Sequence, residues 1–229
     1  MPCRSYGQFC GLARALELVG ERWSLLVIRD LILGPKRFTD LRRGLPKIPT
    51  NILATRLKEL EEGAIVRRRI LPRPATAVVY ELTAYGQELK HILLALGVWG
   101  ARSLGKAQPD DALTADTLIL GLQATFQPEA ARGLTATYEV RAGSVVVHAR
   151  VTDGALDVGH GPLAKADLVI ETGPALKALI SGELSPDEAL ENGSICITGD
   201  RSLLARFVEV FHLAPAPDDR DHSAVRRSA

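Results

Sequence analysis

Cysteine is scarce in this chain, with three residues among 229, and they lie far apart. Such an odd, scattered set does not form the disulfide framework of a small secreted domain. Long hydrophobic runs are also missing. The main apolar run, Ile92–Trp99, is far too short to cross a bilayer. No apolar signal-peptide core follows Met1. These absences predict a cytoplasmic protein with reduced thiols that does not bind membranes.

The motifs of common catalytic sites are absent as well. The chain has no G-x-S-x-G nucleophile elbow, no glycine-rich phosphate loop and no H-E-x-x-H metal motif. Asp153, Asp157 and His160 lie near one another in the sequence, but without cysteine partners they are typical of a solvated loop rather than a metal site. We therefore expect no enzyme activity, no metal and no cofactor.

What the chain does have is an uneven division of charge. Residues 1–106 carry 18 Lys+Arg against 9 Asp+Glu, whereas residues 107–229 carry 10 against 18. The first half therefore has a net charge of +9 and the second half −8, which the whole-chain value of +1 conceals. A compact basic half is typical of a polyanion-binding domain, and an acidic half would repel the same polyanion. We expect a DNA-binding and dimerisation domain over 1–107, an effector domain over 112–214, and a disordered tail over 215–229.

Hydrophobic periodicity in the first half predicts helices, then a hairpin, then another helix. The expected elements are helices from about Phe9 to Gly20, over Trp23–Leu33, Phe38–Arg43 and Thr50–Glu62, strands over Ile65–Leu71 and Ala77–Leu82, and a long helix from Thr83 to about Leu104. Thr50 is expected to cap the fourth helix. A short helix, a tight turn and an amphipathic helix make a helix-turn-helix, and the hairpin that follows is a wing.

The fourth helix has one apolar and one polar face. Leu53, Leu57 and Leu60, together with Ile52, are expected to face the core, while the opposite face is polar. In a helix-turn-helix this second helix enters the major groove of DNA. The candidate DNA-binding residues are Lys36, Arg37, Thr50, Asn51, Thr55, Arg56, Lys58, Arg67, Arg68, Arg69 and Arg73.

Two of these assignments stay open at this point. Arg56 lies at the edge of the polar face, so it is either a phosphate ligand or a structural arginine that bridges two helices. Arg67 and Arg69 alternate with Arg68 along a strand, so all three cannot face DNA equally.

Several segments of the first half resemble HxlR-type winged-helix regulators. They are Cys10–Arg14, Val19–Leu26, Gly34–Leu41, Leu53–Gly63, and Tyr80–Thr83 followed by Gly86. The likeness covers nearly all of residues 8–100, with one departure, Gly11 in place of the usual proline. It implies a dimeric transcription regulator that binds a two-fold symmetric operator of double-stranded DNA. It also implies a dimer built by the first helix and the helix after the wing.

The sequence of the second half predicts an α+β domain, with helices on one face of an antiparallel sheet. The expected strands are Leu134–Arg141, Ser144–Val151, Ala155–Val158, Asp167–Glu171 and Ile195–Thr198. The expected helices are Ala115–Phe126 capped by Thr114, Ala175–Ile180, a helix capped by Ser185 that ends at Asn192-Gly193, and Arg201–His212.

Part of this half looks like a sterol carrier protein type 2 domain. The likeness is carried by Ala166–Ile170, Leu176–Ala189 and Gly193–Asp200, and it is best over residues 165–211 and weak over residues 110–160. It implies a five-stranded sheet and an apolar tunnel for a lipid-like ligand. The candidate lining residues are Leu122, Phe126, Leu176, Ile180, Phe207 and Phe211. The alternative is that these side chains fill the core of a dimerisation or spacer module.

Cys10 lies near the start of the first expected helix, where the helix dipole favours a thiolate. Some members of the HxlR-type family are similar in carrying a cysteine here that senses oxidants or electrophiles. The alternative is a buried structural cysteine. Cys3 is a conceivable resolving partner, and Cys196 lies in an expected strand, either in the core or on the opposite face.

Three functional hypotheses follow from the sequence. The first is a homodimeric transcription regulator modulated by a small apolar ligand in the second domain. The second is a thiol-switched regulator that uses Cys10, with an architectural second domain. The third is a lipid-binding or carrier protein in which the winged helix mediates protein contacts.

Overall fold

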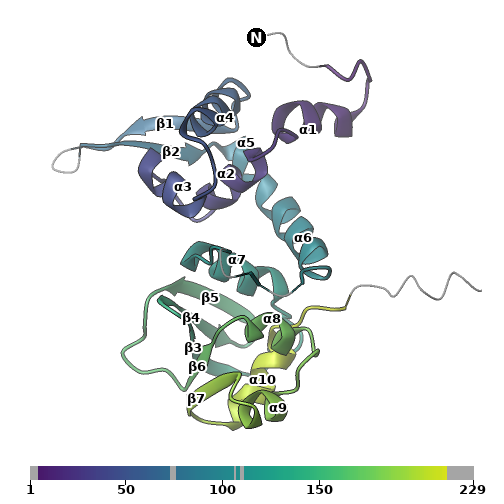
Figure 1. Cartoon of the computed structure of the whole chain (residues 1–229), viewed down its shortest axis with the longest axis vertical. Helices are drawn as coiled ribbons and strands as arrows, with labels where there is room; N and C mark the ends of the chain where they lie inside the picture. The colour runs from purple at the N-terminus through teal and green to yellow at the C-terminus, as the bar shows by residue number, and fades with distance from the viewer. Residues whose placement is uncertain (1–4, 73–75, 106, 109–110, 216–229) are drawn as a thin grey trace, which may run out of the picture. The chain divides into compact units, whose positions relative to one another are not determined.

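The computed structural model describes residues 5–72, 76–105, 107–108 and 111–215 (Figure 1). The chain divides into two compact units, the first made of Met1–Ala95 with Asp110–Thr117, and the second of Leu96–Pro109 with Leu118–Ala229. Arg73, Cys3 and residues 216–229 of the expected tail lie outside the described residues. None of the described helices is both long enough and apolar enough to span a membrane.

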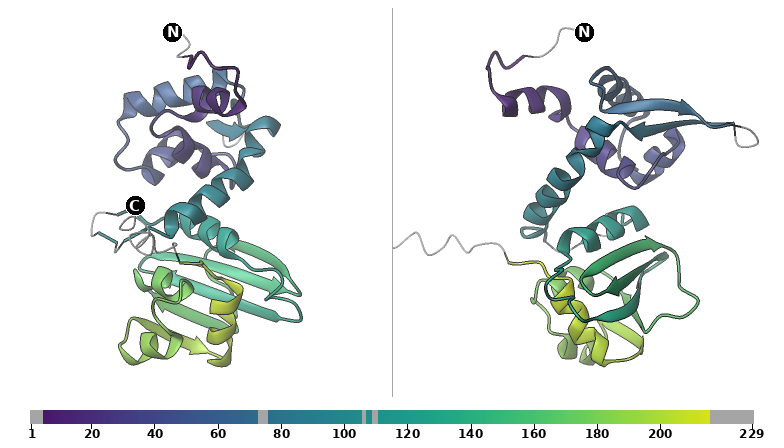
Figure 2. Two further views of the ribbon diagram at one scale, coloured as in Figure 1. Left: turned by 90° about the vertical axis from the view of Figure 1, so that its right-hand side faces the viewer. Right: turned by 180° about the vertical axis from the view of Figure 1, so that it is seen from behind.

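The first unit follows the expected order of helices and hairpin. Its elements are α1 (Gly11–Val19), α2 (Ser24–Leu31), α3 (Phe38–Gly44), α4 (Thr50–Glu62), β1 (Val66–Ile70), β2 (Val78–Leu82), α5 (Ala84–Gln87) and the start of α6 (Leu89–Ala101). The leucine stripe of α4 is confirmed, because Leu53, Leu57 and Leu60 are all buried. Ile52 is only half-buried, so its expected place in the core is wrong. The antiparallel β1–β2 hairpin projects from the helices as a wing (Figure 2).

Two expectations for helix ends are corrected. Thr50 is the first residue of α4 rather than its cap, because Pro49 occupies the cap position with an extended backbone. The long helix expected after the wing is broken into α5 and α6 at Glu88, and α6 ends at Ala101. The Thr83 hydroxyl caps α5 and also donates to the carbonyl of Ala64 at 2.6 Å.

The second unit contains most of α7 (Ala115–Thr125) and all of the remaining elements. They are β3 (Thr135–Ala142), β4 (Val145–Thr152), β5 (Ala155–His160), β6 (Leu168–Thr172), α8 (Ala175–Ile180), α9 (Pro186–Glu191), β7 (Ile195–Gly199) and α10 (Ser202–Val210). Both expected caps are confirmed: Thr114 accepts the Thr117 N–H at 3.2 Å, and Ser185 forms a capping box with Glu188. The fold is therefore α+β.

The sheet is mixed, and the expectation of an antiparallel sheet is wrong. The strand order is β5-β4-β3-β6-β7, and β3 pairs with β6 in parallel while the other three pairings are antiparallel. A parallel neighbour requires a crossover connection. Residues 161–167 form that crossover on the polar side of the sheet, where the Leu163 N–H donates to Glu139 at 2.8 Å and the His148 ring contacts the Gly161 carbonyl at 2.9 Å.

The other face of the sheet is apolar and forms the core of the second unit. Tyr138, Val140, Val147, Ala149 and Ile170 on this face are fully buried. Helices α8, α9 and α10 lie together on one side of the sheet (Figure 2). The alternation of buried and exposed residues in β3, β4 and β6 follows directly from the two-residue period of a strand.

Candidate nucleic-acid interface

The helix-turn-helix consists of α3, the turn over residues 45–49, and α4. The turn is held from inside by Leu45 and Ile48, which are buried, and the Ile48 N–H donates to the Leu45 carbonyl at 3.0 Å. Pro46, Lys47 and Pro49 are exposed on its outer side. Because apolar residues hold the turn in place, the N-terminal end of α4 has a defined direction.

The N-terminal end of α4 presents polar side chains to solvent. Thr50 and Asn51 are exposed, and Thr55 is half-buried, with its hydroxyl donating to the Asn51 carbonyl at 2.9 Å. Lys58 is exposed one turn further along and lies 3.7 Å from Glu62. Thr50, Asn51 and Lys58 are therefore accessible to a ligand from solution.

Arg56 occupies the bridging position that the sequence left open. Its side chain is only 13% exposed and forms ion pairs with Glu21, at 3.4 Å, and with Glu59. Its Nε is buried and has no hydrogen-bond partner among the described residues. The contact with Glu21 joins α4 to the turn between α1 and α2, while Glu59 is on α4 itself, so we do not keep Arg56 among the proposed phosphate ligands.

The arginines of the wing divide between its two faces, as the alternation predicted. Arg67 and Arg69 share Glu81, with Nε-to-carboxylate distances of 2.7 and 3.0 Å. Arg68 points away from them, lies opposite Tyr80 and is exposed. Glu81 partly neutralises one face, so Arg68 provides the clearest positive charge of the described wing.

The segment before α3 is tied to the wing. The Lys36 backbone exchanges two hydrogen bonds with Tyr80, at 2.9 and 2.8 Å. The Lys36 ammonium pairs with Asp116 at 2.5 Å, while Arg37 is exposed at the start of α3. Of these two candidates, Arg37 has the more accessible side chain.

Sequence reasoning missed three basic residues close to the turn. Arg42, Arg43 and Lys47 are exposed on α3 and the turn. A pocket of about 450 Å³ is lined by Thr39, Arg42, Arg43 and Pro46. The adjacent arginines were visible in the sequence, but that Pro46 of the turn lies beside the Thr39, Arg42 and Arg43 face of α3 follows only from the structure.

Cys10 is exposed, so the alternative of a buried structural cysteine is wrong. It is the residue immediately before α1. The backbone N–H groups of Ala13 and Leu12 lower the pKa of the Cys10 thiol. Cys196 is also exposed and lies opposite Glu171 on the polar side of the sheet.

Three of the six residues expected to line a ligand tunnel, Phe126, Phe207 and Phe211, form a contiguous aromatic cluster. Leu122, Phe207 and Phe211 are fully buried and Ile180 is nearly so, while Phe126 and Leu176 are half-buried. The ring centroids of Phe207 and Phe211 are 4.7 Å apart, and those of Phe126 and Phe211 are 5.8 Å apart. None of these six residues lines the pocket beside α3 or the pocket at the end of the sheet.

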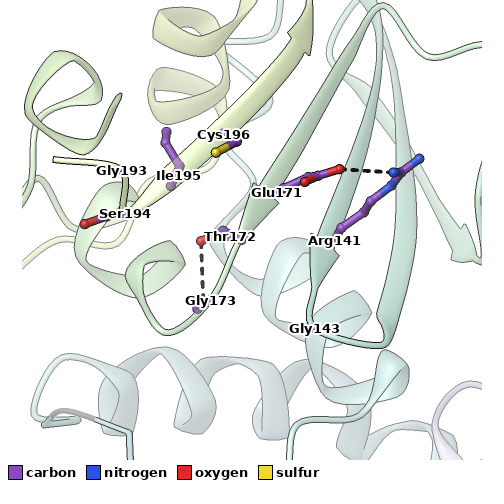
Figure 3. A pocket seen from close by; sticks show the side chains of 9 residues that line it. All are labelled: Arg141, Gly143, Glu171, Thr172, Gly173, Gly193, Ser194, Ile195 and Cys196. Atoms are coloured by element: carbon purple, nitrogen blue, oxygen red, sulfur yellow. Dashed lines mark hydrogen bonds and ion pairs between the residues drawn. The ribbon is translucent and has the colours of Figure 1, made fainter. Parts of the chain in front are cut away.

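A polar pocket of about 440 Å³ lies instead at one end of the sheet (Figure 3). Its lining residues are Arg141, Gly143, Glu171, Thr172, Gly173, Gly193, Ser194, Ile195 and Cys196. Arg141 is held between Glu139, at 2.6 Å, and Glu171, at 3.1 Å. Among the described residues, no group of three or more metal-ligating side chains comes together.

A helix-turn-helix followed by a basic hairpin defines a winged-helix, DNA-binding transcriptional regulator. The chain belongs to the HxlR-like helix-turn-helix family, whose model matches residues 18–108. Its relatives are HTH-type transcriptional regulators. The second unit lies almost entirely beyond this match.

Two curated relatives agree with the family assignment. The chain is 41% identical over 85 residues to the HTH-type transcriptional regulator YodB of Bacillus subtilis, which covers 37% of this chain and 76% of YodB. It is 35% identical over 100 residues to the uncharacterised HTH-type transcriptional regulator sll1512 of Synechocystis sp., covering 44% and 74% of the two chains. A solved structure of the redox regulator HypR in its oxidised form is similar with a TM-score of 0.40 and 32% identity, covering 42% of this chain and 99% of HypR.

Proposed function

We propose that the protein binds a two-fold symmetric operator as a homodimer, with the N-terminal end of α4 in the major groove. The observation that carries this proposal is the exposed pair Thr50 and Asn51 at the start of a helix whose other face is anchored in the core. Asparagine pairs well with adenine in the major groove, and arginine contacts to phosphate supply sequence-independent affinity.

The proposal of a dimer is supported by apolar side chains that this single chain leaves exposed. On α1, Leu12 is 69% exposed and Leu16 is 42% exposed. Helix α6 contains no buried residue at all, although Ile92, Leu96 and Trp99 are apolar. Exposed apolar surface of this kind marks an interaction site, and we assign a second copy of the chain to it.

The test is fluorescence anisotropy with DNA from around the protein's own coding region, over a series of salt concentrations. We expect Asn51→Ala to reduce discrimination between operator and unrelated DNA by ~1–3 kcal/mol. Arg68→Ala should weaken binding to both DNAs equally. Arg132→Ala is the matched control, because Arg132 is an exposed arginine of the acidic unit that pairs with Glu129. If Asn51→Ala still distinguished the operator from unrelated DNA as well as the wild type does, α4 would not lie in the major groove as proposed.

We also propose that the second unit is a sterol-carrier-like effector domain that binds a small, mostly apolar ligand with one hydrogen-bonding group. Two observations support this: the five-stranded sheet with one covered apolar face, and two buried polar atoms, Tyr138 Oη and Gln123 Oε1, that lack partners among the described residues. A ligand controls DNA affinity only if it binds the conformations of the dimer with different affinities. Extracted cell lipids should therefore change both the melting temperature and the operator affinity.

A thiol-switched regulator is the second candidate, and the position of Cys10 favours it. The thiol is exposed, and backbone N–H groups at the start of α1 lower its pKa. A thiolate is the form that reacts with oxidants and electrophiles. Under this hypothesis, diamide changes the operator affinity of the wild type but not that of Cys10→Ser, and lipids change neither.

A further inference from the structure

We propose that the groove formed by Thr39, Arg42, Arg43 and Pro46 binds a phosphate group of the operator backbone. This site lies outside the set of DNA-binding residues that the sequence predicted. The proposal rests on the proposed function as an operator-binding protein. It adds a contact with the DNA backbone from α3 to the contacts proposed for α4 and the wing.

Three of the four residues, Thr39, Arg42 and Arg43, lie on α3 at positions i, i+3 and i+4, which places their side chains next to one another on one face of the helix. Pro46 lies in the turn after the end of α3 and lines the same pocket. Leu41 on the opposite face of α3 and Leu45 just after the helix are buried in the core of the first unit. Arg42 and Arg43 are therefore held on an anchored helix and point away from the core, around a pocket of about 450 Å³.

The charges in this groove are largely uncompensated. Arg42 is exposed and forms no ion pair with any described residue. Arg43 lies 3.5 Å from Asp40, but both side chains are well exposed, at 82% and 41%, so water weakens this pair. The exposed Lys47 adds another positive charge in the turn.

The donors suit a phosphate group. Guanidinium groups bind the oxygens of phosphate through paired N–H donors, and the Thr39 hydroxyl provides a further donor. Pro46 forms an apolar wall that carries no backbone N–H. The groove therefore offers two cations and one hydroxyl to a tetrahedral oxyanion.

The position of the groove favours the phosphate of a nucleic acid over free phosphate. In a helix-turn-helix whose second helix enters the major groove, the first helix crosses the sugar-phosphate backbone. The groove is on that first helix and reaches into the turn, with Thr50 and Asn51 directly after it in the chain. An open groove also suits a ligand that is part of a continuous strand.

The test compares Arg42→Gln, Arg43→Gln and the double variant with the wild type. Binding to an operator and to an unrelated duplex is measured by anisotropy over a salt series. Each lost phosphate contact should make the slope of log K against log salt concentration less steep by ~0.9. The affinity for both duplexes should fall by the same factor, and Arg42→Lys should restore part of the loss.

Arg132→Ala is the control for a loss of surface charge, because Arg132 also pairs with an acidic residue three positions away. Circular dichroism melting of each variant shows whether the first unit still folds. Inorganic phosphate is added in a separate arm, with chloride at matched ionic strength.

The outcomes separate this proposal from the proposed function. If the wild type binds the operator but the variants have unchanged salt slopes, the groove does not bind the backbone and the regulator assignment stands. If inorganic phosphate raises the melting temperature of the wild type but not of the double variant, while the slopes stay unchanged, the groove binds a free anion and our proposal is wrong. If the wild type binds no DNA, both proposals fail.

Discussion

Replacing Tyr138 with phenylalanine removes a single oxygen atom from the core of the second unit, and we expect this change to stabilise the protein. The Tyr138 side chain is fully buried, and its hydroxyl has no hydrogen-bond partner among the described residues. Leaving a buried hydroxyl without a partner costs ~1–3 kcal/mol. Phenylalanine keeps the ring, which lies 5.3 Å from Phe207 and 6.3 Å from Phe211 in edge-on contacts.

We take the lower end of that range, about 1 kcal/mol, as the expected gain. For a domain of ~100 residues this gain corresponds to a rise in melting temperature of about 4–8 °C. Urea unfolding of lipid-extracted protein, followed by circular dichroism, measures it directly. Tyr85→Phe is the control, because Tyr85 is 54% exposed and its replacement should change little.

The same substitution has a signature at high pH. Burial raises the pKa of Tyr138 to about 12. This pKa lies above that of tyrosine in the unfolded chain, so ionisation of Tyr138 is harder in the folded state. The resulting contribution to the free energy of unfolding is fully present below pH ~10 and is lost as the pH rises toward 12. Tyr138→Phe should lack this loss. A destabilisation of 1 kcal/mol or more by Tyr138→Phe at neutral pH would refute the reasoning, because the hydroxyl would then have a partner.

Three further predictions concern other parts of the chain. Phe207→Ala should lower the free energy of unfolding by ~3–5 kcal/mol, since it empties the centre of the aromatic cluster; an unchanged urea midpoint would contradict this. Arg56→Ala should lower the melting temperature of the first unit but leave the salt slope of DNA binding unchanged, whereas Arg68→Ala should do the reverse. At neutral pH, iodoacetamide should alkylate Cys10 faster than Cys196, as followed by peptide mass spectrometry, because α1 lowers the pKa of the Cys10 thiol; equal rates would remove the basis for a thiol switch.

Local patterns in the sequence were enough to predict the winged helix. The stripe of Leu53, Leu57 and Leu60 indicates which side of α4 is buried, and a helix periodicity of 3.6 residues then leaves Asn51 on the opposite side. The alternation of the wing arginines follows in the same way from the two-residue period of a strand. Helix caps such as Ser185 with Glu188 involve residues three positions apart, so the sequence shows them directly.

Contacts between distant residues could not be predicted in this way. The parallel pairing of β3 with β6 depends on where residues 161–167 cross the sheet, which no local period encodes. The role of Arg56 was settled by Glu21, which is 35 positions earlier and comes close only when α1 and α4 pack together. Likewise, only packing showed that Phe126, Phe207 and Phe211 contact one another, because an apolar residue looks the same in a sequence whether it fills a core or lines a cavity. The sequence by itself therefore determined the winged helix and its basic surface, while the tertiary structure decided which of those charges are already paired and which remain exposed to solvent.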